Sequence, residues 1–200
     1  MSELPRFSRG ERLVHRATAL LTLACIATAF VLYYGPVTLV VGHRHVVELV
    51  HVWAGLALPV PMLLGTLSAA YRSDLGRLNR FTAEDWRWLR SKNRRDGSFG
   101  VGKFNAGQKL NASLTAGSVL VLLGTGLLMF YTGLVRLAWR TGATFVHDWV
   151  ALGLGFLVLG HIMFAITDPD ARAGMRTGRV PRRWAEKEHP EWAAEESEAC

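Results

Sequence analysis

The chain has 200 residues, of which 50% are hydrophobic, and it carries a formal net charge of +7. Long apolar runs alternate with arginine-rich segments, which is typical of a protein that crosses a membrane several times. A net positive charge is also found in nucleic-acid-binding proteins. We expect no nucleic-acid partner here, because the basic residues occupy the connections between the apolar runs, where membrane topology already accounts for them.

The two cysteines predict no metal or disulfide framework. Cys25 lies inside the first apolar run and Cys200 is the last residue, so neither has a neighbouring cysteine. This spacing fits neither an iron–sulfur cluster nor a zinc site, and a covalently attached c-type haem would need a Cys-x-x-Cys-His motif. The first apolar run lacks the small-residue cleavage site of a signal peptide, so we interpret it as a retained helix.

Four apolar segments predict four transmembrane helices, at about residues 13–34, 46–71, 112–135 and 144–167. Each has about 20 residues or more, enough to cross the hydrocarbon core as a helix. Pro59 and Pro61 should kink or locally unwind the second helix. The predicted fold class is therefore an all-α membrane protein, a four-transmembrane-helix bundle over residues 1–170 with a tail over residues 171–200.

The connection over residues 72–111 is polar, and Trp86, Trp88 and Leu89 within it suggest an amphipathic helix on the membrane surface. It ends in the run Gly-Lys-Phe-Asn-Ala-Gly-Gln-Lys at residues 102–109, which is typical of a tight turn into the next helix. The tail is acidic at its end, and we expect it to be mobile there.

The lysines and arginines predict the orientation. Of the 23, all but Arg44, Arg136 and Arg140 lie in the N-terminal arm, in residues 72–111 or in the tail. The positive-inside rule therefore places both termini and the long connection in the cytoplasm.

The histidines of the helices sort into pairs by depth. His147 and His161 lie 14 residues apart in the fourth helix, which separates them by about 21 Å on nearly the same face. With this topology, His51 lies near the outer end of the second helix and His15 near the inner end of the first. His51 and His147 thus form an outer pair, and His15 and His161 form an inner pair.

Two imidazoles at one depth on facing helices are suited to ligate a haem iron, so the pairs predict two b-type haems, one near each face of the bilayer. A single histidine at a helix end is more often interfacial, but two depth-matched pairs favour ligation. Zinc or copper is disfavoured, because no cysteine or carboxylate completes either site. Asp148 is a candidate hydrogen-bond partner for His147. We expect no ligand role for the remaining histidines, which are His43, His45 and His189.

Several motifs indicate a family resemblance: residues 11–15, residues 50–55, the run at 102–109, the spacing of His147 and His161, and the tail motifs at 184–185 and 189–192. With them the chain resembles, over nearly its whole length, the gamma or cytochrome b subunit of membrane-bound respiratory formate dehydrogenases. The run at 102–109 is the most specific motif, since related hydrogenase cytochromes b generally lack it.

This resemblance implies the same two histidine pairs and a menaquinone or ubiquinone site beside the inner haem, at Asn105, Gly107, Gln108 and His161. It implies a quinone-reducing subunit in the bacterial inner membrane. An iron–sulfur beta subunit and, through it, a molybdenum or tungsten alpha subunit would be the partners. Formate oxidation would belong to the alpha subunit, and the complex could form a higher oligomer.

Other functions stay open. The same scaffold could serve a hydrogenase or a thiosulfate-type reductase, and a non-haem membrane scaffold or transporter is the alternative of another class. The quinone type, the haem potentials and the direction of electron flow do not follow from the sequence.

Overall fold

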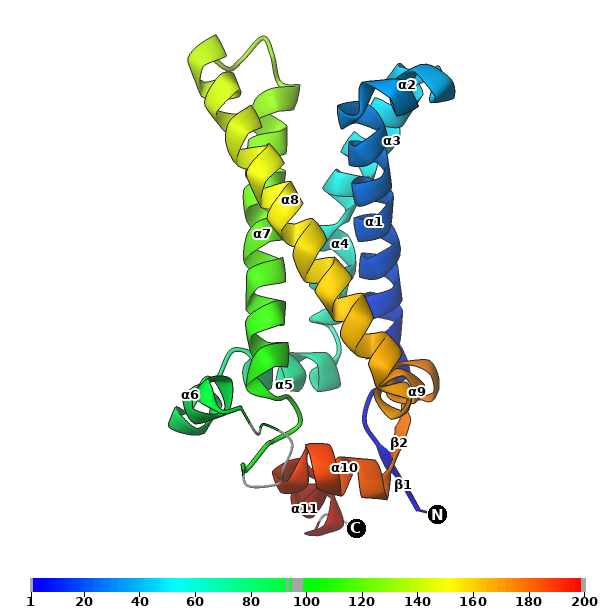
Figure 1. Cartoon of the computed structure of the whole chain (residues 1–200), viewed down its shortest axis with the longest axis vertical. Coiled ribbons are helices and arrows are strands. Elements are labelled where there is room, and N and C mark those ends of the chain that lie inside the picture. The colour runs from blue at the N-terminus through cyan, green and yellow to red at the C-terminus, as the bar shows by residue number, and fades with distance from the viewer. Residues whose placement is uncertain (1, 93, 95–98, 199–200) are drawn as a thin grey trace. The chain divides into compact units, whose positions relative to one another are not determined.

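The structure is a computed structural model that describes residues 2–92, 94 and 99–198 (Figure 1), so that Cys200 lies outside the described residues. Over these ranges, four helical segments are long and apolar enough to cross a membrane. This confirms the predicted class, a helical membrane protein. The segments are α1 (Arg9–Tyr33), α3 with α4 (Arg44–Ala57 and Pro59–Gly65), α7 (Ala106–Phe130) and α8 (Leu137–Thr167).

The first and third spanning helices begin earlier than predicted, because polar side chains cap them. At the start of α1 the Ser8 amide donates to Glu11 Oε2 at 2.6 Å, and the Glu11 amide donates to Ser8 Oγ at 3.2 Å. This reciprocal pair is a capping box, which satisfies backbone N–H groups that the helix itself leaves unpaired. The third helix, α7, begins at Ala106 rather than near residue 112 and ends at Phe130 rather than near residue 135.

The second spanning helix is interrupted at the prolines, as the sequence predicted. Helix α3 ends at Ala57 and α4 begins at Pro59, a first-turn position where the missing N–H of proline is tolerated. The segment ends at Gly65, not near residue 71, because Ser68 caps a separate helix, α5 (Ala69–Leu78). The fourth spanning helix also starts early, at Leu137 rather than near residue 144.

The connections are more helical than predicted. A short helix, α2 (Gly35–Val41), follows α1 and ends at Gly42, whose φ of 72° suits glycine. The amphipathic helix expected around Trp86 is present as α6 (Ala83–Arg90), with a capping box between Thr82 and Asp85. The tail forms α9 (Pro169–Thr177), α10 (Arg182–Glu188) and α11 (Pro190–Glu198).

A two-stranded sheet joins the two ends of the chain, which the sequence did not predict. Strand β1 (Glu3–Pro5) pairs antiparallel with β2 (Arg179–Pro181), and Leu4 lies opposite Val180. Figure 1 shows the two strands side by side at the labelled N-terminus.

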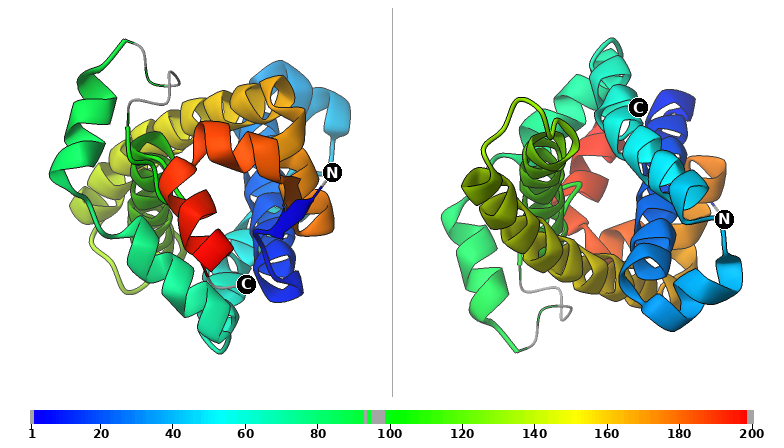
Figure 2. Two further views of the ribbon diagram at one scale, coloured as in Figure 1. Left: turned by 90° about the horizontal axis from the view of Figure 1, so that it is seen from below. Right: turned by 90° about the horizontal axis from the view of Figure 1, so that it is seen from above.

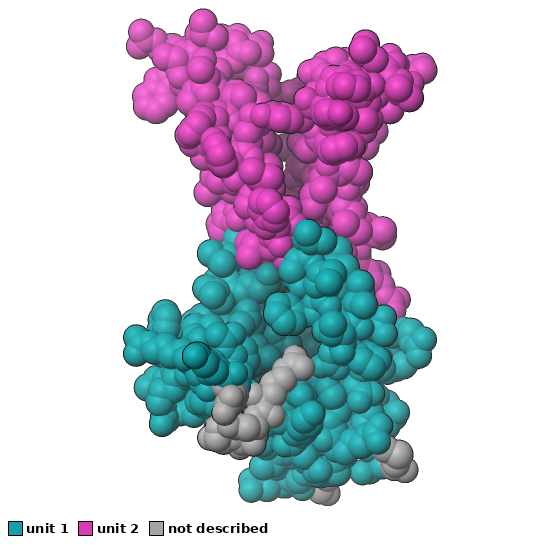
Figure 3. Space-filling view, viewed as in Figure 1, with its two compact units in different colours: residues 1–12, 66–114, 159–200 teal, residues 13–65, 115–158 magenta. Residues whose placement is uncertain are grey.

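The chain divides into two compact units, coloured separately in Figure 3. Unit 2 is Leu13–Gly65 with Thr115–Val158 and holds most of the spanning helices. Its surface carries many exposed large apolar side chains, among them Leu20, Phe30, Leu120 and Phe156. Such a surface suits hydrocarbon, since lipid tails are as apolar as these side chains.

Unit 1 is Met1–Arg12, Thr66–Leu114 and Leu159–Cys200, and the tail supplies most of its core. The buried apolar cluster consists of Leu4, Val180, Trp184, Ala185, Trp192 and Ala193. The expectation of a mobile tail is therefore wrong. Helices α10 and α11 pack against each other (Figure 2), and α11 buries Trp192 while its acidic residue Glu195 is exposed.

We predict that Trp192→Ala unfolds the tail. The Trp192 side chain has 0% exposure, and removing a buried tryptophan costs roughly 3–5 kcal/mol. Limited proteolysis of the detergent-purified chain should cleave residues 182–198 much faster in this variant. Trp86→Ala is the control, because Trp86 is 52% exposed in the same unit. Equal cleavage of the tail in both variants would contradict the prediction.

Candidate functional site

His51 and His147, the predicted outer pair, lie next to each other within unit 2, with the edge of one ring toward the other. His51 comes from α3 and His147 from α8, and both side chains are half-buried. Their ring centroids are 6.3 Å apart and the ring planes cross at 65°. The structure thus brings together two imidazoles that are almost a hundred residues apart in the sequence.

Each of these histidines is hydrogen-bonded to a threonine on a further helix. Thr28 Oγ1 of α1 lies 2.9 Å from His51 Nδ1, and Thr125 Oγ1 of α7 lies 2.9 Å from His147 Nδ1. All four spanning segments therefore contribute one side chain to this cluster.

The sequence did not predict the two threonines. It proposed Asp148 as the partner of His147, but the Asp148 side chain is exposed, and Thr125 bonds the ring instead. Adjacent residues of a helix point in different directions, so Asp148 shares no face with His147.

The outer pair fits a haem iron. Neutral imidazoles are common ligands of haem iron, and with ring centres 6.3 Å apart His51 and His147 could both bind one iron. In the space-filling view, unit 2 is hollowed between two columns of side chains (Figure 3).

His15 and His161 lie in different units, His15 in unit 2 and His161 in unit 1. Both side chains are exposed. Helix α8 is continuous from Leu137 to Thr167, so His147 and His161 share one helix as predicted. The pairing of His15 with His161 stays a prediction.

The run at residues 102–109 forms the expected turn into the third spanning helix. The backbone N–H of Asn105 donates to Gln108 Oε1 at 3.0 Å, and the backbone N–H of Gln108 donates to Asn105 Oδ1 at 2.9 Å. These two residues therefore form the capping box of α7. Both bonds use the side-chain oxygen of the residue, and neither uses its NH₂ group.

Gly107 lies against an aromatic ring of the chain itself. A Cβ atom at Gly107 would lie 3.4 Å from two ring atoms of Trp88. The cavity between Trp88 and Asn105 measures about 10 Å³. This is room for one water molecule and far less than a ligand pocket of about 300 Å³ or more.

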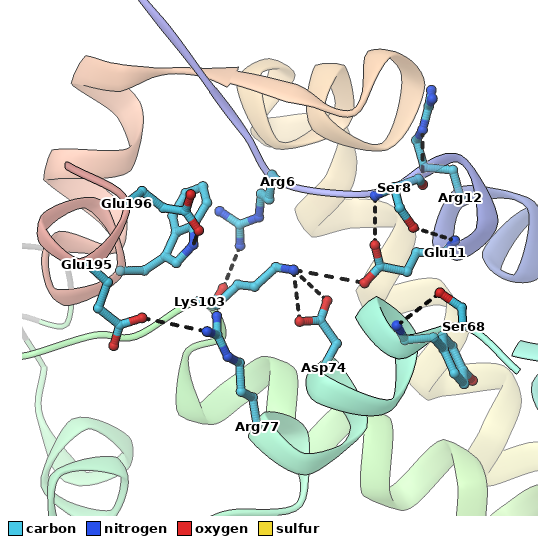
Figure 4. A network of polar contacts seen from close by, with 12 residues as sticks. Arg6, Ser8, Glu11, Arg12, Ser68, Asp74, Arg77, Lys103, Glu195 and Glu196 are labelled. Atoms are coloured by element: carbon cyan, nitrogen blue, oxygen red, sulfur yellow. Dashed lines mark hydrogen bonds and ion pairs between the residues drawn. The ribbon is translucent and has the colours of Figure 1, made fainter. Parts of the chain in front are cut away.

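Two largely buried lysines, Lys103 and Lys109, fix the ends of this run, and Figure 4 shows the first of them. Lys103 Nζ donates to both carboxylate oxygens of Asp74, at 2.8 and 2.6 Å, and lies 3.9 Å from Glu11 Oε1. Lys109 Nζ donates to both oxygens of Asp85, at 2.9 and 2.8 Å. Breaking one partner of such a buried pair would leave an uncompensated charge.

Arg6 and His189 hold the backbone of the same run. An Arg6 terminal nitrogen donates to the Lys103 carbonyl at 2.8 Å and lies 3.0 Å from His189 Nε2, while His189 Nδ1 lies 2.8 Å from the Gly102 carbonyl. Because guanidinium only donates and a carbonyl only accepts, His189 is neutral with its proton on Nδ1. The Arg6 guanidinium lies 4.6 Å from the Trp184 ring centre, and burial lowers the pKa of Arg6 to about 10.

Four apolar spanning segments and a facing pair of threonine-bonded histidines define a helical membrane protein of the b-cytochrome class. A family model described as prokaryotic cytochrome b561 matches residues 6–177. The chain belongs to this family, which implies that it binds haem b.

The chain is also similar to proteins named "Formate dehydrogenase, nitrate-inducible, cytochrome b556(Fdn) subunit". Those of Escherichia coli (strain K12), Escherichia coli O157:H7 and Shigella flexneri are each 32% identical to it over 98 residues. The matched segment covers 48% of this chain and 45% of each relative, so the chain spans about half the length of the curated relatives it matches. The resemblance to formate dehydrogenase cytochrome b subunits is confirmed over these 98 residues, which is less than the nearly full length that the motifs suggested.

We predict that Asp74 makes stability depend on pH near neutrality. Burial, with Glu11 adding to it, raises the pKa of Asp74 from 3.8 to about 7, and Lys103 opposes the rise. From about pH 4 to 7 the folded chain therefore holds a proton that the unfolded chain releases. The free energy of unfolding then falls as pH rises through this window.

The Asp74→Asn side chain does not titrate, so the thermal unfolding midpoint of this variant should change less between pH 5 and pH 8 than that of the wild type. The midpoints are measured by tryptophan fluorescence in detergent. Parallel pH profiles for the variant and the wild type would show that Asp74 does not carry the effect.

Proposed function

We propose that this chain is the membrane cytochrome b subunit of a formate dehydrogenase complex. It would pass electrons from an iron–sulfur subunit through two b haems to the quinone pool. The observation that carries this proposal is the outer pair, in which the ring centres of His51 and His147 lie 6.3 Å apart, so that both imidazoles could bind one iron. The similarity to formate dehydrogenase cytochrome b subunits supports the choice of partner complex.

In this proposal four histidines hold the two irons. His51 and His147 would ligate the outer haem, and His15 and His161 the inner one. Bound haem supplies one-electron redox chemistry. The basic residues favour cytoplasmic termini, so the outer pair would lie on the side opposite them, where an iron–sulfur partner could deliver electrons.

The proposed quinone site uses Asn105, Gly107, Gln108 and His161. Quinone carbonyls accept hydrogen bonds, and the amide NH₂ groups of Asn105 and Gln108 are donors held in place by the capping bonds of their oxygens. Trp88 packs against Gly107, so a quinone ring that reaches Gly107 must displace or stack on this indole. Reducing a quinone also takes up two protons, which suits a site beside polar side chains.

The histidine pairs predict which haem each substitution removes. His51→Ala and His147→Ala should each abolish the same haem, while His15→Ala and His161→Ala should each abolish the other, because each substitution removes one of the two imidazoles that would hold that haem. Haem content per chain and a redox titration measure this. His43→Ala, in the exposed connection after α2, is the control and should keep both haems. Haem retained in all four variants would refute this ligand assignment, and a wild-type protein without haem absorbance would instead favour a non-haem scaffold or transporter.

The amide groups allow capping to be separated from quinone binding. Asn105→Asp and Gln108→Glu keep the capping oxygens but lack the NH₂ donors. We expect these variants to fold and keep both haems, with quinone reduction by the assembled complex at least tenfold slower, since a site left without a hydrogen bond to its substrate discriminates strongly. Asn105→Ala should lower stability by about 1 kcal/mol. Normal quinone reduction in both acidic variants would refute this quinone site.

Formate-dependent quinone reduction by the assembled complex tests the identity of the partner. If hydrogen or a sulfur compound exchanges electrons with the haems instead, the chain serves a hydrogenase or a thiosulfate-type reductase. The assignment of the haem ligands would stand in either case.

A further inference from the structure

The threonine–histidine bonds of unit 2 have a defined direction. Thr28 Oγ1 donates to the Ala24 carbonyl at 2.6 Å and lies 3.1 Å from the Cys25 carbonyl. Thr125 repeats the pattern, with the Val121 carbonyl at 2.7 Å and the Leu122 carbonyl at 3.2 Å. A hydroxyl has one hydrogen, and here a carbonyl takes it. Each threonine oxygen is therefore left to accept a hydrogen bond from the imidazole N–H.

The direction of the bond fixes the tautomer of both rings. In both His51 and His147 the hydrogen must be on Nδ1, which donates it in a hydrogen bond to the threonine oxygen. The Nδ1 to Oγ1 distance is 2.9 Å in each case. The lone pair of each neutral ring is then on Nε2, the atom that can bind a metal. Exchanging the tautomer would break a hydrogen bond within an apolar helix, where no water replaces it.

The bonds also fix the orientation of the rings. Each histidine is held from a different helix, His51 by α1 and His147 by α7, and the ring planes cross at 65°. A hydrogen bond to the far nitrogen of a metal-bound histidine sets the ring orientation and raises the basicity of the ligand. Higher basicity favours the ferric over the ferrous iron and so lowers the midpoint potential.

We propose that Thr28 and Thr125 are positioning residues for the outer haem, which hold His51 and His147 with Nε2 toward one iron and keep the potential of that haem low. This inference rests on the proposed haem ligation by His51 and His147. It assigns a task to two residues that are not ligands themselves.

The test compares Thr28→Val and Thr125→Val in the full-length haem-loaded protein, because valine keeps the shape and removes the hydroxyl. We expect the midpoint potential of the outer haem to rise, the low-spin ferric EPR signal of that haem to move, and its affinity to fall about tenfold. The inner haem should be unaffected. A tenfold change in the ratio of ferric to ferrous affinity would appear as about 59 mV for this one-electron couple.

Two further variants separate positioning from packing. Thr22→Val removes a hydroxyl from the same helix as Thr28, one that donates to the Thr18 carbonyl at 2.8 Å, and it should leave both potentials unchanged. Thr28→Ser and Thr125→Ser restore the hydroxyl and should restore the wild-type potential. Since the two threonines lie on different helices, a folding defect in one valine variant leaves the other informative.

The inference is overturned if both valine variants keep the wild-type potentials and EPR signals, or if Thr22→Val shifts the outer haem equally. Failure of the proposed function looks different. If His51→Ala loses no haem, the ligation itself is wrong. If His51→Ala loses one haem while the valine variants match the wild type, only the role of the threonines is wrong.

Discussion

A polar side chain inside an apolar helix must find its hydrogen-bond partner within the protein, because the surrounding hydrocarbon offers none. His51 and His147 meet this constraint through Thr28 and Thr125 on neighbouring helices. The same requirement shapes unit 1, where buried Asp74 is paired with Lys103. These pairings, more than apolar contact, fix which helix faces approach one another, since a helix with an apolar surface all round has no preferred face.

The sequence predicted the spanning helices and the outer histidine pair because both depend on properties that run along one helix. Apolar length predicts a span, and topology predicts the depth of each histidine. The threonine partners depend instead on how each helix is rotated against its neighbour. Thr22 and Thr28 of α1 both donate to the carbonyl four residues before them, and only the folded chain shows that Thr28 faces His51.

The tail was mispredicted for a related reason. Its acidic composition is typical of a mobile end, but Trp184 and Trp192 enclose Arg6, which lies close to the other end of the chain. His189 completes this contact with Arg6 across 183 positions of sequence. No local pattern in the tail indicates such a distant partner. The contact of the Arg6 cation with two indole rings stabilises the folded tail, although its exposed glutamates are typical of a mobile segment.

The residues proposed to bind a cofactor or quinone each use one polar atom for a hydrogen bond within the protein and leave a second polar atom for the ligand. In His51 the Nδ1 atom bonds Thr28, and Nε2 is the proposed iron ligand. In Gln108 the amide oxygen caps α7, and the NH₂ group is the proposed quinone donor. One half of each side chain is thereby fixed before any ligand binds, which lowers the cost of ordering the other half. Imidazole and carboxamide groups suit these positions, because each has two polar atoms and can bond the fold with one while the other meets the ligand.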